Sequence, residues 1–82
     1  MTRPVKRSFA IDGHRTSISL EAEFWDALKT AAKEDHVAIA AIVASIDKTR
    51  GGAGLSSAVR VWLLRRLEAR ATSGANAAKA YG

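Results

Sequence analysis

The stretch at residues 14–26, HRTSISLEAEFWD, constrains the fold most, because a two-residue hydropathy alternation passes there directly into a helical period. Ile18 and Leu20 alternate with polar residues, which predicts a short strand with one apolar face. Immediately after it, Phe24 and Leu28 are four residues apart, as the buried stripe of a surface helix requires. A lone strand leaves its backbone N–H and C=O groups unpaired, so this strand needs a partner strand.

The preceding residues supply one candidate partner. Residues 6–11, KRSFAI, also alternate, and the dipeptide Asp-Gly at residues 12–13 joins them to the strand. Asp-Gly between two alternating runs is typical of a type I′ turn, whose two central residues need positive φ. A two-residue turn would place Ile11 opposite His14, which predicts a β-hairpin over residues 6–20. Its polar face would carry Lys6, Ser8, Arg15, Ser17 and Ser19.

Three helices are predicted by the apolar spacing that follows the hairpin. They cover residues 21–35, 38–48 and 55–70, and a glycine-containing loop at residues 49–54 separates the last two. In the second helix, apolar residues recur at positions i, i+3, i+4 and i+7, so one stripe of that helix is expected to be buried. The residues of this stripe are Ile39, Ile42, Val43 and Ile46.

Size and composition limit how such a chain is stabilised. With 82 residues and no cysteine, one marginally stable domain is expected, and oligomerisation would supply extra burial. The two histidines lack the spacing of a zinc cluster, so no metal and no cofactor is predicted. No apolar run approaches the ~20 residues of a membrane span, and the N-terminus lacks a signal-peptide core, so we expect a cytoplasmic protein that does not bind membranes. Residues 1–5 and 71–82 are expected to form a flexible arm and tail.

The charge pattern points to a polyanionic partner. The formal net charge is +5 and the sequence pI is near 10.3, which favours nucleic acid first and an anionic membrane second. No nucleophile, base and orienting acid can be assembled from two distant histidines and surface carboxylates, so an enzyme is not expected. Two segments are basic: the front of the chain with Arg3, Lys6, Arg7 and Arg15, and the third helix with Arg60, Arg65, Arg66 and Arg70, which are expected to face outward.

The order of strand, helix, sharp turn and helix resembles the ribbon-helix-helix superfamily, the group that contains Arc and the methionine repressor. Residues 14–48 carry the resemblance, and HRTSISLEAEFWDAL is its most specific part. The fuller pattern over residues 6–70 looks like a bacterial subgroup with an N-terminal hairpin extension and a third helix. The resemblance implies a mainly α fold with a short N-terminal β element, in which two copies form an intertwined homodimer through an intermolecular antiparallel β-ribbon.

The resemblance also implies a function. Proteins of this kind are DNA-binding transcription regulators, often repressors, whose ribbon enters the major groove of double-stranded DNA. Carried over by position, Arg15, Ser17 and Ser19 would face base edges. Phosphate contacts would come from Lys6, Arg7 and the backbone N–H groups at Ala38 and Ile39. The dimer core would consist of Ile18, Leu20, Phe24, Leu28, Ile39, Ile42, Val43 and Ile46.

Two features of the sequence leave a second function open. Ala38 stands where the family commonly has a serine or threonine that caps the second helix. In addition, if the strand at residues 6–11 pairs beside its neighbour in both copies, the sheet has four strands and spans roughly 14 Å, against about 12 Å for the major groove. The extension must then bend away, or the sheet binds something else. The alternative is a dimeric protein-interaction module of the same fold with weak or no specific DNA binding.

Overall fold

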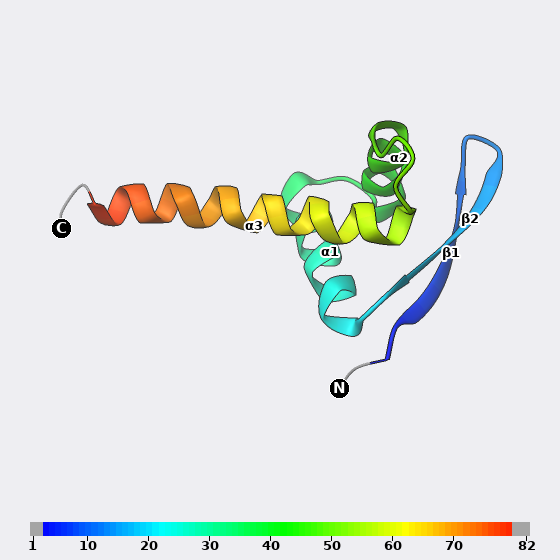
Figure 1. Ribbon diagram of the computed structural model, residues 1–82, viewed down its shortest axis with the longest axis horizontal. Helices are drawn as coiled ribbons and strands as arrows, with labels where there is room; N and C mark the ends of the chain where they lie inside the picture. The colour runs from blue at the N-terminus through cyan, green and yellow to red at the C-terminus, as the bar shows by residue number, and fades with distance from the viewer. Residues whose placement is uncertain (1–2, 80–82) are drawn as a thin grey trace.

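The computed structural model describes the backbone of residues 3–79 and the side chains of residues 3–71. In chain order the elements are β1 (Val5–Ile11), β2 (His14–Leu20), α1 (Ala22–Asp35), α2 (Ile39–Thr49) and α3 (Leu55–Lys79). The two strands form a hairpin along one side of the three helices, and α3 projects beyond the other elements (Figure 1). The fold is therefore mainly α with a short N-terminal β element, as the sequence predicts.

The hairpin has the predicted turn and register. β1 and β2 pair antiparallel with Ile11 opposite His14. Asp12 and Gly13 have φ angles of 49° and 81°, the positive values that a type I′ turn needs. The face that carries Ile11 and Ile18 packs against the helices, and both side chains are buried there. The opposite face is turned away from the helices.

Helix α1 is bounded by two residues with different backbone conformations. Glu21 is its extended N-cap, and His36 is its C-cap in the left-handed region, with φ 55°. The backbone N–H of His36 donates to the carbonyl oxygens at the end of the helix, so His36 forms the sharp turn that the sequence predicts. Trp25 belongs to the core, with 3% of its surface exposed. Its indole Nε1 donates to the carbonyl oxygen of Val5 at 2.9 Å, which satisfies the buried N–H and ties α1 to β1.

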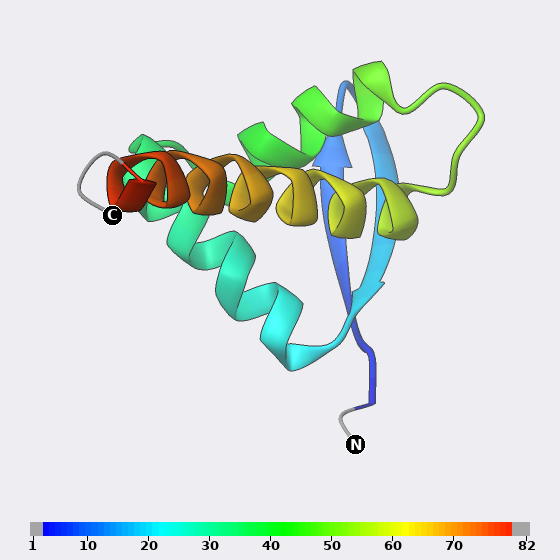
Figure 2. The same cartoon turned by 60° about the vertical axis from the view of Figure 1, so that its left-hand side comes forward.

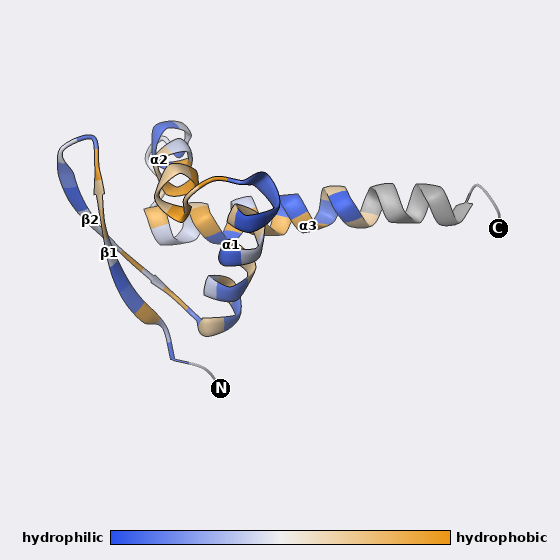
Figure 3. Ribbon diagram, turned by 180° about the vertical axis from the view of Figure 1, so that it is seen from behind, coloured by the Kyte–Doolittle hydropathy of each residue, from blue (hydrophilic) through white to orange (hydrophobic). Residues whose placement is uncertain are grey.

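All three helices and the hairpin contribute to one hydrophobic core. Helix α2 contributes three residues of its predicted stripe, and Figure 3 shows orange segments in this helix. Among the described side chains, none that is polar or charged is buried. The core is thus formed within a single chain. Its buried members are Ile11, Ile18, Leu20, Trp25, Leu28, Ala31, Ala32, Ile42, Val43, Ile46, Leu55, Val59 and Leu63.

Helix α3 differs most from the prediction. It continues to Lys79, so the predicted end at residue 70 was too early. Residues 71–79 contain several alanines, the strongest helix formers, and a single glycine costs a helix only about 1 kcal/mol relative to alanine. Smaller differences of one residue affect the ends of β1, α1 and α2. Residues 1–2 of the predicted arm and 80–82 of the predicted tail lie outside the described residues.

Candidate nucleic-acid interface

The outer face of the hairpin displays the polar side chains that the sequence places there. The register sets Lys6 opposite Ser19, Ser8 opposite Ser17, and Ala10 opposite Arg15. The hydroxyl oxygens of Ser8 and Ser17 lie 3.3 Å apart across the strands. All six residues are exposed except Ser19, which is half-buried. The three residues predicted to face base edges, Arg15, Ser17 and Ser19, therefore share one surface with Lys6.

Arg7 lies on the other face of the hairpin. It is paired with Ile18, and its guanidinium carbon is 5.2 Å from the ring centroid of Trp25, within the range of a cation–π contact. Phe9 stacks on the same indole with the ring centroids 6.0 Å apart. Arg7 thus packs against Trp25 on the inner face of the hairpin. Of the two strand cations predicted to contact phosphates, only Lys6 is on the outer face.

The edge of β2 that does not pair with β1 forms hydrogen bonds to α3 at one residue, Ser19. The backbone N–H of Ser19 donates to the Ser56 hydroxyl oxygen at 3.1 Å, and Arg60 donates from Nη2 to the Ser19 carbonyl oxygen at 3.2 Å. Arg60 also forms an ion pair with Glu21 at 2.9 Å. The backbone N–H of Glu21, and then the Arg60 guanidinium, lower the pKa of this carboxyl. The Ser56 hydroxyl, in the first turn of α3, is therefore engaged by the edge of β2.

Most of the α3 arginines that were predicted to face outward form ion pairs with acidic residues of the same chain. Besides Arg60, Arg66 pairs with Asp35 at 2.7 Å, and Arg70 pairs with Glu34 at 2.8 Å. These pairs depend on tertiary packing, so helix periodicity in the sequence did not reveal them. Residues 3–20, which comprise the hairpin and the two residues before it, contain four arginine or lysine residues and one acidic residue. None of these four cations forms an ion pair with another described residue. The four cations are Arg3, Lys6, Arg7 and Arg15.

The N-terminus of α2 is the second predicted phosphate site. Its N-cap, Ala38, has an extended backbone and no side-chain hydrogen bond to the helix, and Ala38 is exposed. The first backbone N–H groups of the helix, beginning at Ile39, are consequently open to a ligand. Figure 2 shows that this end of α2 is separated from the hairpin within one chain. A single chain therefore does not bring the two predicted DNA-contacting regions together.

The residues predicted to form a dimer core are packed inside the single chain. Ile18, Leu20, Leu28, Ile42, Val43 and Ile46 are buried there, whereas Phe24 and Ile39 are half-buried against them. This packing accounts for most of the predicted set without a second chain. Phe24 and Ile39 retain exposed surface, so they are the members still available to another molecule.

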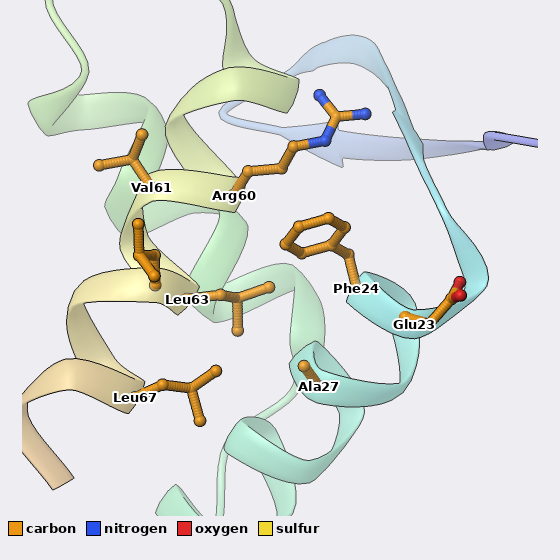
Figure 4. Close-up of a pocket in the computed structure, with 8 residues that line it drawn as sticks. Glu23, Phe24, Ala27, Arg60, Val61, Leu63 and Leu67 are labelled. Carbon is orange, nitrogen blue, oxygen red and sulfur yellow. The ribbon is translucent and has the colours of Figure 1, made fainter. Parts of the chain in front are cut away.

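An apolar groove between α1 and α3 was not anticipated from the sequence. Phe24 and Ala27 line it from α1, and Leu63 and Leu67 line it from α3, with Arg60 at one end (Figure 4). Its volume is about 370 Å³. Three large apolar side chains of α3 at the groove are 45–55% exposed: Val61, Leu64 and Leu67. The signal that could have revealed it is the spacing of these three residues, which adds a second apolar stripe to α3.

Two features are absent from the part of the chain that the structure describes. The described residues contain no group of three or more histidine, cysteine, aspartate or glutamate side chains that could hold a metal ion. No helix in that part of the chain has the length and hydropathy needed to cross a membrane.

Comparison with known proteins identifies the family. The family model described as the ribbon-helix-helix domain matches residues 4–67, which include the hairpin, α1, α2 and the first half of α3. The chain therefore belongs to the ribbon-helix-helix family, and the resemblance seen in the sequence is confirmed. Proteins of this family are commonly DNA-binding transcription regulators. No curated protein and no solved structure matches the chain.

Proposed function

We propose that this protein is a dimeric, DNA-binding transcription regulator whose hairpin enters the major groove by its outer face. One observation carries the proposal: Lys6 and Arg15 are exposed on the outer face and have no ion-pair partners among the described residues. In α3, by contrast, three arginines form ion pairs within the chain. A positive surface of this kind attracts the phosphate backbone. Membership in the family supports the same function.

The outer face carries the chemistry needed to read bases. Arginine donates two parallel hydrogen bonds to O6 and N7 of guanine, the most frequent specific contact in the major groove. Arg15 is therefore the principal reader. Ser17 has a hydroxyl that donates or accepts, so it contacts either kind of base and discriminates less. Ser19 is half-buried, and its hydroxyl lies at the margin of the reading surface.

The width of the sheet assigns different roles to the two strands. In the proposed dimer, β2 of one copy pairs with β2 of the second copy, which gives a sheet of four strands and roughly 14 Å. Because the major groove is about 12 Å wide, only the two central strands reach the base edges. Each β1 then lies over a wall of the groove, where the phosphates are. Lys6, on the outer face of β1, is accordingly a phosphate contact.

The N-terminus of α2 adds a second phosphate contact in this proposal. Its open N–H groups at Ile39 and the positive end of the helix dipole favour an anion. Since Ala38 contributes no side-chain hydroxyl, this contact rests on the backbone alone. These groups position the protein on the duplex and carry no sequence information.

A selection experiment tests the proposal. Duplexes bound by the purified protein are enriched from a random library, and binding of the enriched duplex and a scrambled duplex is measured across a salt series. Light scattering gives the oligomeric state in parallel. We expect a dimer that prefers the enriched duplex and loses affinity steeply as salt increases. Failure to enrich any sequence, together with equal or no binding to both duplexes at low salt, would refute it.

The α1–α3 groove favours a second candidate function. Val61, Leu64 and Leu67 form an exposed apolar surface at one side of the molecule, and such surfaces are typical of protein contacts. Under this alternative, the protein is an interaction module of the same fold with little or no sequence-specific DNA binding. The selection experiment distinguishes the two functions, because an interaction module would enrich no duplex.

A further inference from the structure

The free edge of β2 has a fixed set of outward backbone groups. A two-residue type I′ turn makes Ile11 and His14 a hydrogen-bonded pair, and hydrogen-bonded and non-hydrogen-bonded pairs then alternate along the hairpin. The N–H and C=O groups of Arg15, Ser17 and Ser19 consequently point away from β1. The bond from the Ser19 N–H to α3 agrees with this alternation.

Only part of this edge is open to another strand. Ser56 occupies the N–H of Ser19, and Arg60 occupies its carbonyl oxygen. Glu21 fixes the guanidinium of Arg60 in this position through two hydrogen bonds, from Nε at 3.1 Å and from Nη2 at 2.9 Å. Arg15 and Ser17, by contrast, are exposed. An added strand therefore finds outward groups at Arg15 and Ser17, but not at Ser19.

We infer that two copies of this chain pair through β2 in an antiparallel register centred on Thr16, with Arg15 of each copy opposite Ser17 of the other. The inference rests on the dimer of the proposed function and specifies its interface. Arg15 and Ser17 of both copies then exchange about four backbone hydrogen bonds across the ribbon. The two Thr16 residues form the non-hydrogen-bonded pair at the two-fold axis.

The competing register is centred on Ser17. It would place Arg15 opposite Ser19 of the second copy, where the side chains of Ser56 and Arg60 already bind the edge. In the Thr16-centred register, the residue opposite Ser19 is Gly13. The chain turns there toward β1 and leaves the edge free for α3. The contact between α3 and Ser19 thus selects between two otherwise similar registers.

The register determines how far apart the two copies of Arg15 lie along the ribbon. With a rise of about 3.4 Å per residue, the Thr16-centred register offsets them by two residues, or about 7 Å, and the Ser17-centred register by four residues, or about 14 Å. Successive bases of one DNA strand are also about 3.4 Å apart. The two arginines would therefore read bases about two pairs apart in the inferred register and about four pairs apart in the other.

Single-cysteine cross-linking tests the register, because the chain has no cysteine of its own. Thr16→Cys and Ser17→Cys are each oxidised under mild conditions, and covalent dimer is followed on non-reducing gels. A disulfide needs Cα atoms within about 7 Å of each other. Residues at the two-fold axis lie about 4.5 to 5.5 Å apart, whereas the same residue shifted from the axis is separated by more than 7 Å. We expect Thr16→Cys to cross-link at least about tenfold faster than Ser17→Cys.

Ser8→Cys is the matched control for the opposite edge of the hairpin. Ser8 lies on β1, with its backbone groups directed away from β2, and it is exposed like Ser17. Faster cross-linking of Ser17→Cys would overturn the inferred register, and faster cross-linking of Ser8→Cys would overturn pairing through β2. A dimer by light scattering that forms no cross-link in any variant would place the interface elsewhere. A monomer by light scattering would refute the dimer itself, which separates failure of the proposed function from failure of the register.

A second variant tests the role assigned to α3. Ser56→Ala, introduced into the Ser17→Cys chain, removes the acceptor for the Ser19 N–H. We expect it to increase the cross-linking rate of Ser17→Cys, because more of the edge becomes available to the second copy. Circular dichroism confirms that the chain remains folded. A folded Ser56→Ala chain whose rate is unchanged would show that α3 does not select the register.

Discussion

Arg66 and Asp35 form a two-pronged ion pair between α3 and the end of α1. Nη2 of Arg66 lies 2.7 Å from Oδ1 of Asp35, and Nη1 donates to Oδ2 at 2.9 Å. Nη2 also reaches Glu34 at 3.2 Å, and the guanidinium lies 5.5 Å from the ring centroid of Trp62. The parallel geometry of two N–H···O bonds fixes orientation as well as charge. This pair therefore anchors α3 to α1 at the point where α3 leaves the core.

Acid is expected to weaken this anchor. Arg66 lowers the pKa of Asp35, and Arg70, followed by Arg66, lowers the pKa of Glu34, from ordinary values of 3.8 and 4.5. A lowered pKa in the folded state stabilises the fold above the unfolded-state pKa, and this contribution is lost as the pH falls through the folded-state value. We predict that Arg66→Met lowers Tm at neutral pH and reduces the further fall in Tm on acidification from about pH 6 to about pH 3.

Arg65→Met is the control for this experiment. Arg65 is exposed on the same helix and forms no ion pair with another described residue. Its Tm profile should follow that of the unmodified chain. Identical profiles for the Arg65 and Arg66 variants would contradict the assignment of the acid sensitivity to the α1–α3 ion pairs.

The packing of the single chain predicts different effects for two leucines. Leu28 is fully buried in α1, whereas Leu64 of α3 is 55% exposed. Replacing a buried leucine with alanine removes apolar contacts and leaves a cavity, so Leu28→Ala should lower the free energy of unfolding by about 2 to 5 kcal/mol. Leu64→Ala should change it by no more than about 0.5 kcal/mol. Denaturant titration measures both, and similar losses would show that the exposed groove is a stabilising interface.

Two glycines with different backbone conformations, Gly13 in the hairpin turn and Gly52 between α2 and α3, are expected to respond in opposite ways to replacement by alanine. Gly13 has φ 81°, and Gly52 does not lie in the left-handed region; neither position has an atom within 4 Å that an added Cβ would meet. Gly13→Ala is therefore strained by its backbone alone, and we expect a loss of about 1 to 2 kcal/mol. Gly52→Ala should be neutral or stabilising by up to about 1 kcal/mol, because it restricts the unfolded chain. Thermal unfolding decides, and a neutral Gly13→Ala would argue against the type I′ turn.

The hairpin could be predicted from sequence because its determinants are local. Asp12 and Gly13 specify the turn, and the alternation on both sides specifies the register and the faces. The break between α1 and α2 at His36 also has a local determinant, because the apolar spacing of each helix ends on either side of it. The attachment of α3 depends on residues far apart in sequence: Ser56 with Ser19, and Arg66 with Asp35. Residue type and helical spacing do not encode such contacts, so the occupied edge of β2 could not be predicted.

Strand alternation explains which of the predicted site residues lie on the outer face of the hairpin and which do not. Arg15, Ser17 and Ser19 share the outer face because strand alternation assigns every second residue to it. Arg7 is paired with Ile18, so the same alternation puts it on the inner face, where it packs on Trp25. The exposed groove at Leu64 and Leu67 was not predicted. The spacing of Val61, Leu64 and Leu67 shows that α3 has a second apolar stripe, but it does not show which of the two stripes the core covers.

Lys6 is expected to contribute charge without sequence preference. We predict that Lys6→Ala weakens binding to the enriched and scrambled duplexes alike and reduces the slope of log affinity against log salt by about 1. Lys29→Ala is the control, because Lys29 is exposed on α1, away from the outer face of the hairpin. A Lys6 variant that lost affinity for the enriched duplex only would instead be reading bases.

The most direct measurement is the affinity of the enriched duplex for the unmodified protein, Arg15→Ala and Arg65→Ala at one salt concentration. Both arginines are exposed and without ion-pair partners among the described residues, but only Arg15 lies on the outer face of the hairpin. We predict that Arg15→Ala costs about 1 to 3 kcal/mol on the enriched duplex and less on the scrambled duplex, whereas Arg65→Ala has little effect on either. An Arg15→Ala protein that keeps full affinity and preference, or an equal loss with Arg65→Ala, would contradict the proposal that this face of the hairpin reads DNA.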